Sequence, residues 1–202
     1  MQKRKRSETE KVKIYIDTCI LQGAISRRNR EDTIFMNKVK GKGWKVYTSI
    51  HTLMELLDTA KDRSFLMKSV IKKWVDVSTF LQGRKTKNLS RNDLDEIAEE
   101  LNNFFINHSF IEFMNIHEEV WKDVKDIAEK SNLHSSDALH LALARMWGCH
   151  VLVTHDTFFM KEGNKLLKEG QQYDFLRICD VDKVEETIKE VKPERRSLLE
   201  LL

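Results

Sequence analysis

A short apolar run near the N-terminus ends in an acid, and this feature constrains the fold more than any other. The run covers residues 14–16 and is followed by Asp17, after which apolar residues resume. A run of this length, rich in β-branched and aromatic residues, predicts a strand that is buried on both faces. Because ligands of open α/β sheets bind outside the carboxyl ends of the strands, Asp17 is predicted to lie at a binding edge.

Length and composition favour one soluble domain with long helices. The chain has 202 residues, a formal net charge of +3 and 33% charged residues, which suits a single domain with a sizeable core. One proline and seven glycines are too few for an all-β protein rich in turns. No apolar run is long enough to span a membrane, and no apolar signal segment follows the basic N-terminus. We therefore expect no association with a membrane.

The cysteines indicate the compartment. Cys19, Cys149 and Cys179 lie far apart, and none belongs to a C-x-x-C pair. A disulfide framework or a zinc knuckle is therefore not expected, and a reducing cytoplasm is the expected location.

Apolar segments alternate with stretches of helical periodicity along the chain. Strands are predicted at residues 13–17, 44–48, 110–116, 151–153 and 175–179. Helices are predicted at residues 31–40, 49–58, 62–81, 90–105, 118–130, 138–147 and 184–191. Such alternation predicts an α/β fold, a three-layer α/β/α sandwich around a central parallel sheet. Residues 60–108 would form a helical insertion between the second and third strands.

The chain is predicted to divide into three parts. Residues 1–11, which include Lys3-Arg4-Lys5-Arg6, are expected to be a disordered basic arm. Such an arm either contacts nucleic-acid phosphates or is a solvated tail or a localisation signal. Residues 12–180 would form the folded domain, and residues 181–202 a C-terminal helical extension.

Four acids accompany the most apolar segments. Asp17 ends the first strand, Glu55 lies in the helix after the second, Asp137 opens a very apolar helix, and Asp156 follows the fourth strand. In a parallel sheet the strand ends and the starts of the following helices share one edge, so the four carboxylates are predicted to converge. Each acid also has a plainer explanation, as a helix cap, a solvated helix position or a turn residue.

Converging carboxylates indicate a metal site. They repel one another unless a cation compensates their charge, and ligands that are all oxygen select Mg²⁺ or Mn²⁺. Such an ion can activate water for attack on a phosphodiester. Basic residues at 27–30, 38–45, 61–73 and 84–91 would then hold the nucleic-acid backbone.

Four segments in this order resemble the motifs of PIN domains. They are Ile16-Asp17-Thr18, Ser49-Ile50-His51-Thr52-Leu53-Met54-Glu55, Ser136-Asp137-Ala138-Leu139-His140-Leu141-Ala142 and Leu152-Val153-Thr154-His155-Asp156-Thr157-Phe158. The resemblance covers roughly residues 12–180. It implies a Rossmann-like sandwich and, as in the VapC-type toxins, Mg²⁺- or Mn²⁺-dependent endoribonuclease activity. It also implies metal ligation by Asp17, Glu55, Asp137 and Asp156, with Thr154 holding a water or the last acid.

Two positions depart from the family pattern. Cys19 stands where PIN domains often have Asn, and a thiol is a poor hydrogen-bond donor. His155 precedes the fourth acid, where it either contacts the substrate or is a surface turn residue. His51 lies one turn before Glu55, but the sequence shows no second paired ligand and so predicts no zinc site. His140 either lines the pocket or packs against the next element.

The function predicted from these residues is metal-dependent cleavage of single-stranded RNA. Asp17, Asp137 and Asp156 would hold the metal, and Glu55 would be a ligand or a base that positions water. The expected partners are RNA, an antitoxin protein and a second copy of the chain. The second copy is expected because the apolar stripes at 65–81 and 94–105 are either core or a dimer face. The alternatives are a PIN-like RNA- or protein-binding scaffold without catalysis and a flap-type DNA nuclease, which the short length disfavours.

Overall fold

The computed structural model describes residues 11–71, 89–169 and 175–191. Within these ranges five strands form one sheet with the order β3-β2-β1-β4-β5, and every pair of neighbours is parallel. The strands are β1 (Lys13–Ile16), β2 (Lys45–Ser49), β3 (Ile111–Met114), β4 (Val151–Val153) and β5 (Arg177–Cys179). The strand that carries the first acid is therefore the central one.

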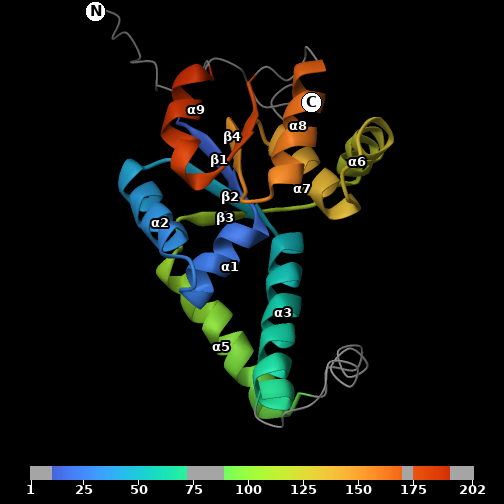
Figure 1. The fold of residues 1–202 in the computed structure, drawn as a ribbon. Coiled ribbons are helices and arrows are strands. Elements are labelled where there is room, and N and C mark those ends of the chain that lie inside the picture. The colour runs from blue at the N-terminus through green and yellow to red at the C-terminus, as the bar shows by residue number, and fades with distance from the viewer. Residues whose placement is uncertain (1–10, 72–88, 170–174, 192–202) are drawn as a thin grey trace, which may run out of the picture.

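Helices lie on both faces of the sheet (Figure 1). One layer contains α6 (Glu118–Lys130), α7 (Ser135–Met146) and α8 (Thr157–Glu169). The other contains α1 (Thr18–Ser26), α2 (Arg30–Lys42), α3 (Ile50–Phe65), α5 (Arg91–Asn107) and α9 (Val184–Glu190). Two short turns of helix, η1 (Leu66–Ile71) and η3 (Val181–Lys183), complete the described elements. The predicted three-layer α/β/α sandwich is confirmed.

The central strand shows why the apolar runs are continuous. Ile14 pairs with Val46 of β2 on one side and with Val151 of β4 on the other. Tyr15 packs into the core beneath α6 and α7, whereas Ile14 packs into the core beneath α1 and α2. Since both faces are covered by helices, every position of this strand is buried, and an alternating polar pattern is excluded.

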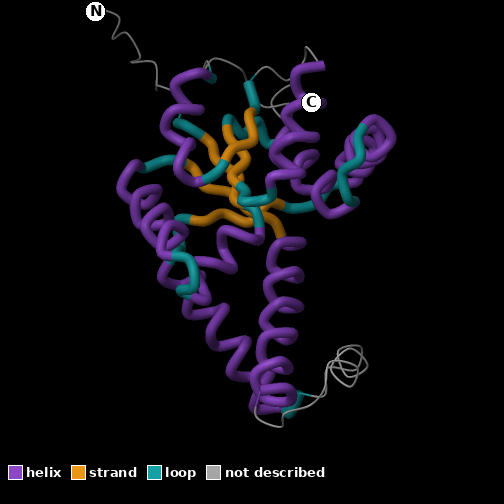
Figure 2. The backbone as a smooth tube through the Cα atoms, viewed as in Figure 1, coloured by secondary structure: helices purple, strands orange, loops and turns teal. Residues whose placement is uncertain are grey.

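The helical insertion between β2 and β3 forms an arm. In Figures 1 and 2, α3 and α5 extend away from the sheet and meet at their far ends. Ser49 caps α3 as predicted, and a capping box of Ser90 and Asp93 opens α5. The predicted break between helices near residue 60 is wrong, because no glycine or proline interrupts the segment and Ala60 is buried in the core. The predicted helix at 62–81 is described only as far as residue 71, and its residues 72–81 and the basic loop at 83–88 lie outside the described residues.

Three further helical details differ from the sequence predictions. No helix was expected at α1 or α8, because α1 continues the apolar run of β1 and α8 follows directly after the turn that carries Asp156. The helix α7 begins at Ser135, and its N-cap residue is His134. Asp137 therefore lies in the first turn of α7 and does not cap it.

The ends of the chain fall largely outside the described ranges. The basic arm predicted at residues 1–11 lies outside them except for Lys11. Within the predicted C-terminal extension, α9 packs against β4 and β5, and Val184 is buried. Among the described residues, no helix is long and apolar enough to cross a membrane. All three cysteines are free.

A glycine allows α1 and α2 to approach closely. Asp32 at the start of α2 is only 1% exposed, and within the described part of the chain its Oδ2 atom has no hydrogen-bond partner. A Cβ atom at Gly23 of α1 would overlap this Oδ2 and would lie 2.9 Å from Cγ of Asp32. Gly23 therefore leaves room for a buried carboxylate.

We predict that Gly23→Ala destabilises the protein by about 1–3 kcal/mol, because the new methyl group forces the Asp32 side chain to move. Gly41→Ala is the matched control, since a Cβ there has nothing within 4 Å and the substitution should stabilise α2 by about 0.5–1 kcal/mol. Urea unfolding of both variants measures the difference. Equal stability of the two variants would contradict the close approach.

Candidate functional site

Asp17 joins the ends of the two central strands. Its backbone N–H donates to the carbonyl of Val153 at 3.0 Å, which continues the pairing of β1 with β4. Its carboxylate accepts from the backbone N–H of Thr18 at 2.6 Å and from the hydroxyl of Thr154 at 2.7 Å. Asp17 is buried, so these bonds hold a negative charge in a defined orientation at the carboxyl edge of the sheet.

Thr154 also positions Asp156. The backbone N–H of Asp156 donates to the Thr154 hydroxyl at 3.0 Å. One carboxylate oxygen of Asp156 accepts from the N–H of Phe159 in the first turn of α8 at 2.8 Å, as a helix cap does. The side chain of Asp156 is otherwise exposed at the edge. The Thr154 hydroxyl thus bonds to two of the predicted acids, to the side chain of Asp17 and to the backbone of Asp156.

Asp137 experiences the charge of the other acids. It is half-buried in the first turn of α7. Burial raises the pKa of its carboxyl, and the negative charges of Asp17 and Asp156 raise it further. A carboxyl group whose pKa is raised by neighbouring carboxylates is a fitting environment for a divalent cation, which removes the repulsion. The structure therefore brings these three acids to one edge.

Glu55 has a different environment, because donors surround its carboxylate. The hydroxyls of Thr18 and Ser136 donate to it. Nε2 of His140 lies 3.0 Å from Oε2, and Nε2 of His51 lies 3.4 Å from Oε1. Burial raises the pKa of Glu55, but the hydrogen bonds from His140, His51, Ser136 and Thr18 together lower it well below its usual range. Glu55 is therefore an ionised group held from several sides.

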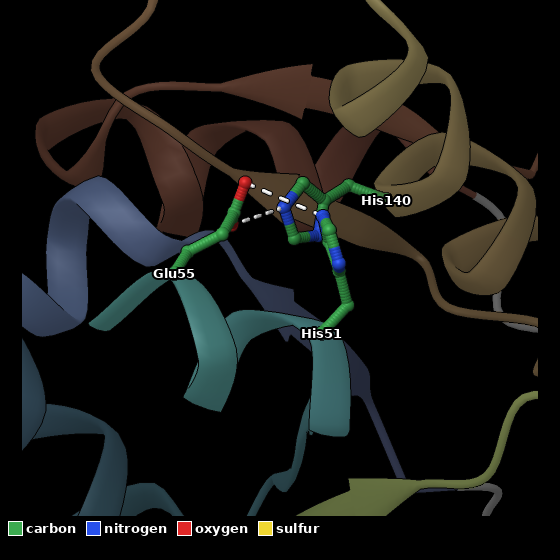
Figure 3. A group of neighbouring side chains, drawn as sticks. All are labelled: His51, Glu55 and His140. Atoms are coloured by element: carbon green, nitrogen blue, oxygen red, sulfur yellow. Dashed lines mark hydrogen bonds and ion pairs between the residues drawn. The ribbon is translucent and has the colours of Figure 1, made fainter. Parts of the chain in front are cut away.

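The sequence placed His51 one turn before Glu55 and left open whether His140 lines the pocket, but it did not bring the two histidines together at Glu55. Figure 3 shows the side chains of His51 and Glu55, both from α3, pointing toward His140 of α7. Among the described residues these three form a group whose ligand atoms all lie within 4.8 Å of one another, and the four acids form no such group. The one-turn spacing of His51 and Glu55 indicates that their side chains lie on the same face of a helix. The contact between α3 and α7, which adds His140, could not be predicted from the sequence.

His140 links this group to the first acid. Its side chain is fully buried, and Nε2 lies 3.5 Å from Oδ1 of Asp17. Its other ring nitrogen, Nδ1, lies 2.7 Å from the hydroxyl of Tyr15. Burial lowers the pKa of His140, but Tyr15, Glu55 and Asp17 raise it by more, so it ends well above its usual value. The carboxylates of Asp17 and Glu55 thus share one cationic neighbour.

Cys19, the first departure from the family pattern, supports Asp17. Its thiol lies 3.3 Å from Oδ2 of Asp17 and 3.4 Å from the Thr154 hydroxyl, and it accepts from the N–H of His155 at 3.3 Å. Burial and then the charge of Asp17 raise the pKa of Cys19 to about 12. The thiol is therefore protonated and can donate to Asp17, although weakly.

His155, the second departure, lies in the turn after β4, where its partly exposed imidazole bridges two carboxylates. Nε2 lies 2.6 Å from Oδ1 of Asp32, and Nδ1 lies 2.8 Å from Oδ1 of Asp180. The imidazole therefore connects α2, the end of β5 and the turn that carries Asp156. Burial lowers the pKa of His155, but Asp32 and Asp180 raise it above its usual value.

The fold and this edge define a class: a doubly covered parallel sheet with acids gathered at the carboxyl ends of its strands. Residues 14–162 match the family model described as "PIN domain". The chain therefore belongs to the PIN domain family, whose members are generally nucleases that use divalent metals.

Two solved structures are similar to the chain. One is VapBC2 from Rickettsia felis bound to a DNA fragment from their promoter, with a TM-score of 0.52, 13% identity, and coverage of 84% of this chain and 98% of that chain. The other is DNA-bound VapBC from Salmonella typhimurium, with a TM-score of 0.49, 18% identity and the same two coverages, 84% and 98%. At this identity the first likeness supports the fold alone. Comparison with curated proteins gives no match.

We predict that His155 makes stability depend on pH. A histidine with a raised pKa in the folded state contributes stability that is complete below the unfolded value of about 6.5 and is lost as the pH rises through the raised value. His155→Gln should therefore be most destabilising at acidic pH and converge toward the parent protein as the pH rises.

Urea unfolding between about pH 5.5 and 9 in the presence of EDTA measures this convergence. His117→Gln is the control, because His117 is exposed and makes no side-chain cap to α6. A difference between His155→Gln and the parent that stays constant across this range would show that His155 is not charged between its two carboxylates.

Proposed function

We propose that the chain is a Mg²⁺- or Mn²⁺-dependent endoribonuclease. The observation that carries this proposal is the position of Asp17, Asp137 and Asp156 at the carboxyl edge of the sheet, where the charges of Asp17 and Asp156 raise the pKa of Asp137. Membership of the PIN domain family supports nuclease chemistry at that edge. The edge is the position where ligands of open α/β sheets bind.

In the proposed site Asp17, Asp137 and Asp156 would hold the ion, with Glu55 as a further ligand or as the base that positions water. A hard divalent ion supplies an activated water and neutralises charge that develops on the phosphodiester. Thr154 and Cys19 contribute by orienting the carboxylate of Asp17. Glu55, which is ionised and held by donors, is suited to orient a polar group without changing its own position.

Basic side chains would bind the RNA strand. The sequence clusters them at 27–30, 38–45, 61–73 and 84–91. In the described part of the chain, Lys38 and Lys42 contact Glu185, and Arg63 contacts Glu100. Ion pairs as exposed as those of Lys38 and Lys42 contribute little to stability, so these lysines can exchange a carboxylate for a phosphate. We propose that phosphate contacts of this kind hold the single strand.

A toxin of a toxin–antitoxin pair is the biological role that we propose for this activity. The similar fold of VapBC2 from Rickettsia felis was solved with VapBC2 bound to a DNA fragment from their promoter. Exposed apolar side chains on this chain, Ile50 and Met54 of α3 and Phe113 of β3, offer surface for an antitoxin or a second copy. The free cysteines fit a reducing cytoplasm, where we expect the protein to act.

The second candidate is a PIN-like RNA- or protein-binding scaffold that has lost catalysis. It is favoured by Glu55, whose carboxylate is occupied by protein donors. The intact Asp17, Asp137 and Asp156 favour the nuclease. A scaffold would bind RNA without cleaving it, and Mn²⁺ would leave its thermal stability unchanged.

We predict that Asp17→Asn lowers the rate of RNA cleavage by at least about 100-fold, because a direct metal ligand should matter no less than its supporting groups. Cleavage of total RNA with Mg²⁺ or Mn²⁺, mapped by sequencing of the new ends, is the measurement, and EDTA should abolish it. Asp126→Asn is the control, since Asp126 is only partly buried on α6, where it pairs with Lys130. Cleavage that persists in both Asp17→Asn and EDTA would refute the nuclease assignment.

A further inference from the structure

We infer that His51, Glu55 and His140 form a binding site for a transition-metal ion of the Zn²⁺ class, next to the three-aspartate site. Imidazole nitrogens suit Zn²⁺ and its neighbours, whereas Mg²⁺ prefers oxygen ligands. The inference goes beyond the proposed nuclease, because it adds His51 and His140 as ligands and gives Glu55, the fourth acid of the nuclease proposal, a place in a nitrogen-containing site. It does not require the chain to cleave RNA.

The spacing of the three side chains fits such an ion. Ligands about 2.0–2.1 Å from a tetrahedral Zn²⁺ lie about 3.3 Å from one another. Nε2 of His51 lies 3.4 Å from Oε1 of Glu55, and Nε2 of His140 lies 3.0 Å from Oε2. An ion can therefore enter with small movements of side chains that already face one another (Figure 3).

A hydrogen bond at Nδ1 orients the His140 ring so that Nε2 faces Glu55. The hydroxyl of Tyr15 donates to Ser49 Oγ at 3.1 Å. The Tyr15 oxygen can therefore accept a proton from Nδ1 of His140, 2.7 Å away. This leaves Nε2 directed at Glu55, where it carries a proton in the cationic imidazole and can bind a metal ion once that proton is lost. A hydrogen bond on the other ring nitrogen is the usual support of a metal-binding histidine.

The remaining surroundings also favour an ion. The hydroxyls of Thr18 and Ser136 hold the Glu55 carboxylate in place, as groups around a metal-binding carboxylate commonly do. His140 is buried, whereas the side chains of His51 and Glu55 are 27% and 29% exposed. The site is therefore closed on one side and open to solvent on the other, which leaves room for a water or a substrate atom as a fourth ligand.

An ion at this position would join two elements that frame the edge. His51 and Glu55 belong to α3, which leads into the helical arm, and His140 belongs to α7, which carries Asp137 in its first turn. Oδ1 of Asp17 lies 3.5 Å from Nε2 of His140, so the site borders the three-aspartate site. Loading of this site would stabilise the folded state, because the unfolded chain does not present these ligands together.

Binding of ZnCl₂ to the full chain, measured by competition with a chromogenic chelator, tests the inference. We predict one bound equivalent, and His51→Ala should weaken its affinity by at least about tenfold. His51 is the first choice because it is partly exposed, and His140→Gln, checked for folding by circular dichroism, is the second variant. His117→Ala on the exposed start of α6 is the matched control and should bind Zn²⁺ as the parent does.

Spectroscopy on the same variants identifies the ligands. Absorption of the Co²⁺-loaded protein and X-ray absorption of the Zn²⁺-loaded protein should both indicate imidazole ligands, and His51→Ala should lose part of each signal. Absence of Zn²⁺ binding, or Zn²⁺ binding that is unchanged in His51→Ala and in folded His140→Gln, would overturn the inference.

Asp137→Asn separates this inference from the nuclease proposal. Asp137 is not among the three ligands, so the variant should keep its Zn²⁺ affinity within a few-fold, whereas RNA cleavage should fall. Zn²⁺ binding that depends on His51, without any cleavage by the parent protein, would support the metal site and refute the nuclease. Mg²⁺-dependent cleavage without His51-dependent Zn²⁺ binding would do the reverse.

Discussion

The hydrogen bond from the Thr154 hydroxyl to Asp17 is the interaction on which the functional edge depends. It joins the ends of β1 and β4, whose register places Ile16 beside Val153. A shift of that register by one residue would turn the side chains of β1 to the opposite faces of the sheet. The core on both sides of the sheet therefore holds Asp17 in place, and Asp17 in turn defines where the other acids meet.

Charge at this edge is balanced in two different ways. Glu55 is surrounded by hydroxyl and imidazole donors, which keep it ionised without a metal. Asp137, by contrast, is disfavoured as an anion by burial and by its acidic neighbours. Side chains whose ionised form is unfavourable in the protein without its ligand are common at functional sites, because the ligand removes the unfavourable interaction. The two environments lie side by side, and His140 borders both.

The fold was largely readable from the sequence. Continuous apolar runs predicted buried parallel strands, and Ser49 and Ser90 marked the starts of helices correctly. The sequence pattern does not predict α1 and α8. Each of these helices begins directly after an acid, and the pattern assigns that acid to the end of the preceding strand. Local pattern also placed a break inside α3, where packing against the core maintains one helix. Boundaries of this kind depend on tertiary contacts that a window of sequence does not contain.

The sequence by itself determined the parallel sandwich and the placement of Asp17, Asp137 and Asp156 at one edge, because strand order and the alternation of strands and helices dictate where strand ends lie. Only the tertiary structure decided that His140 meets Glu55 across a separation of 85 residues, and that His155 lies between Asp32 and Asp180. The reason is physical: these pairings arise where helices from different parts of the chain pack together. Their side-chain geometry depends on the packed core and not on local sequence.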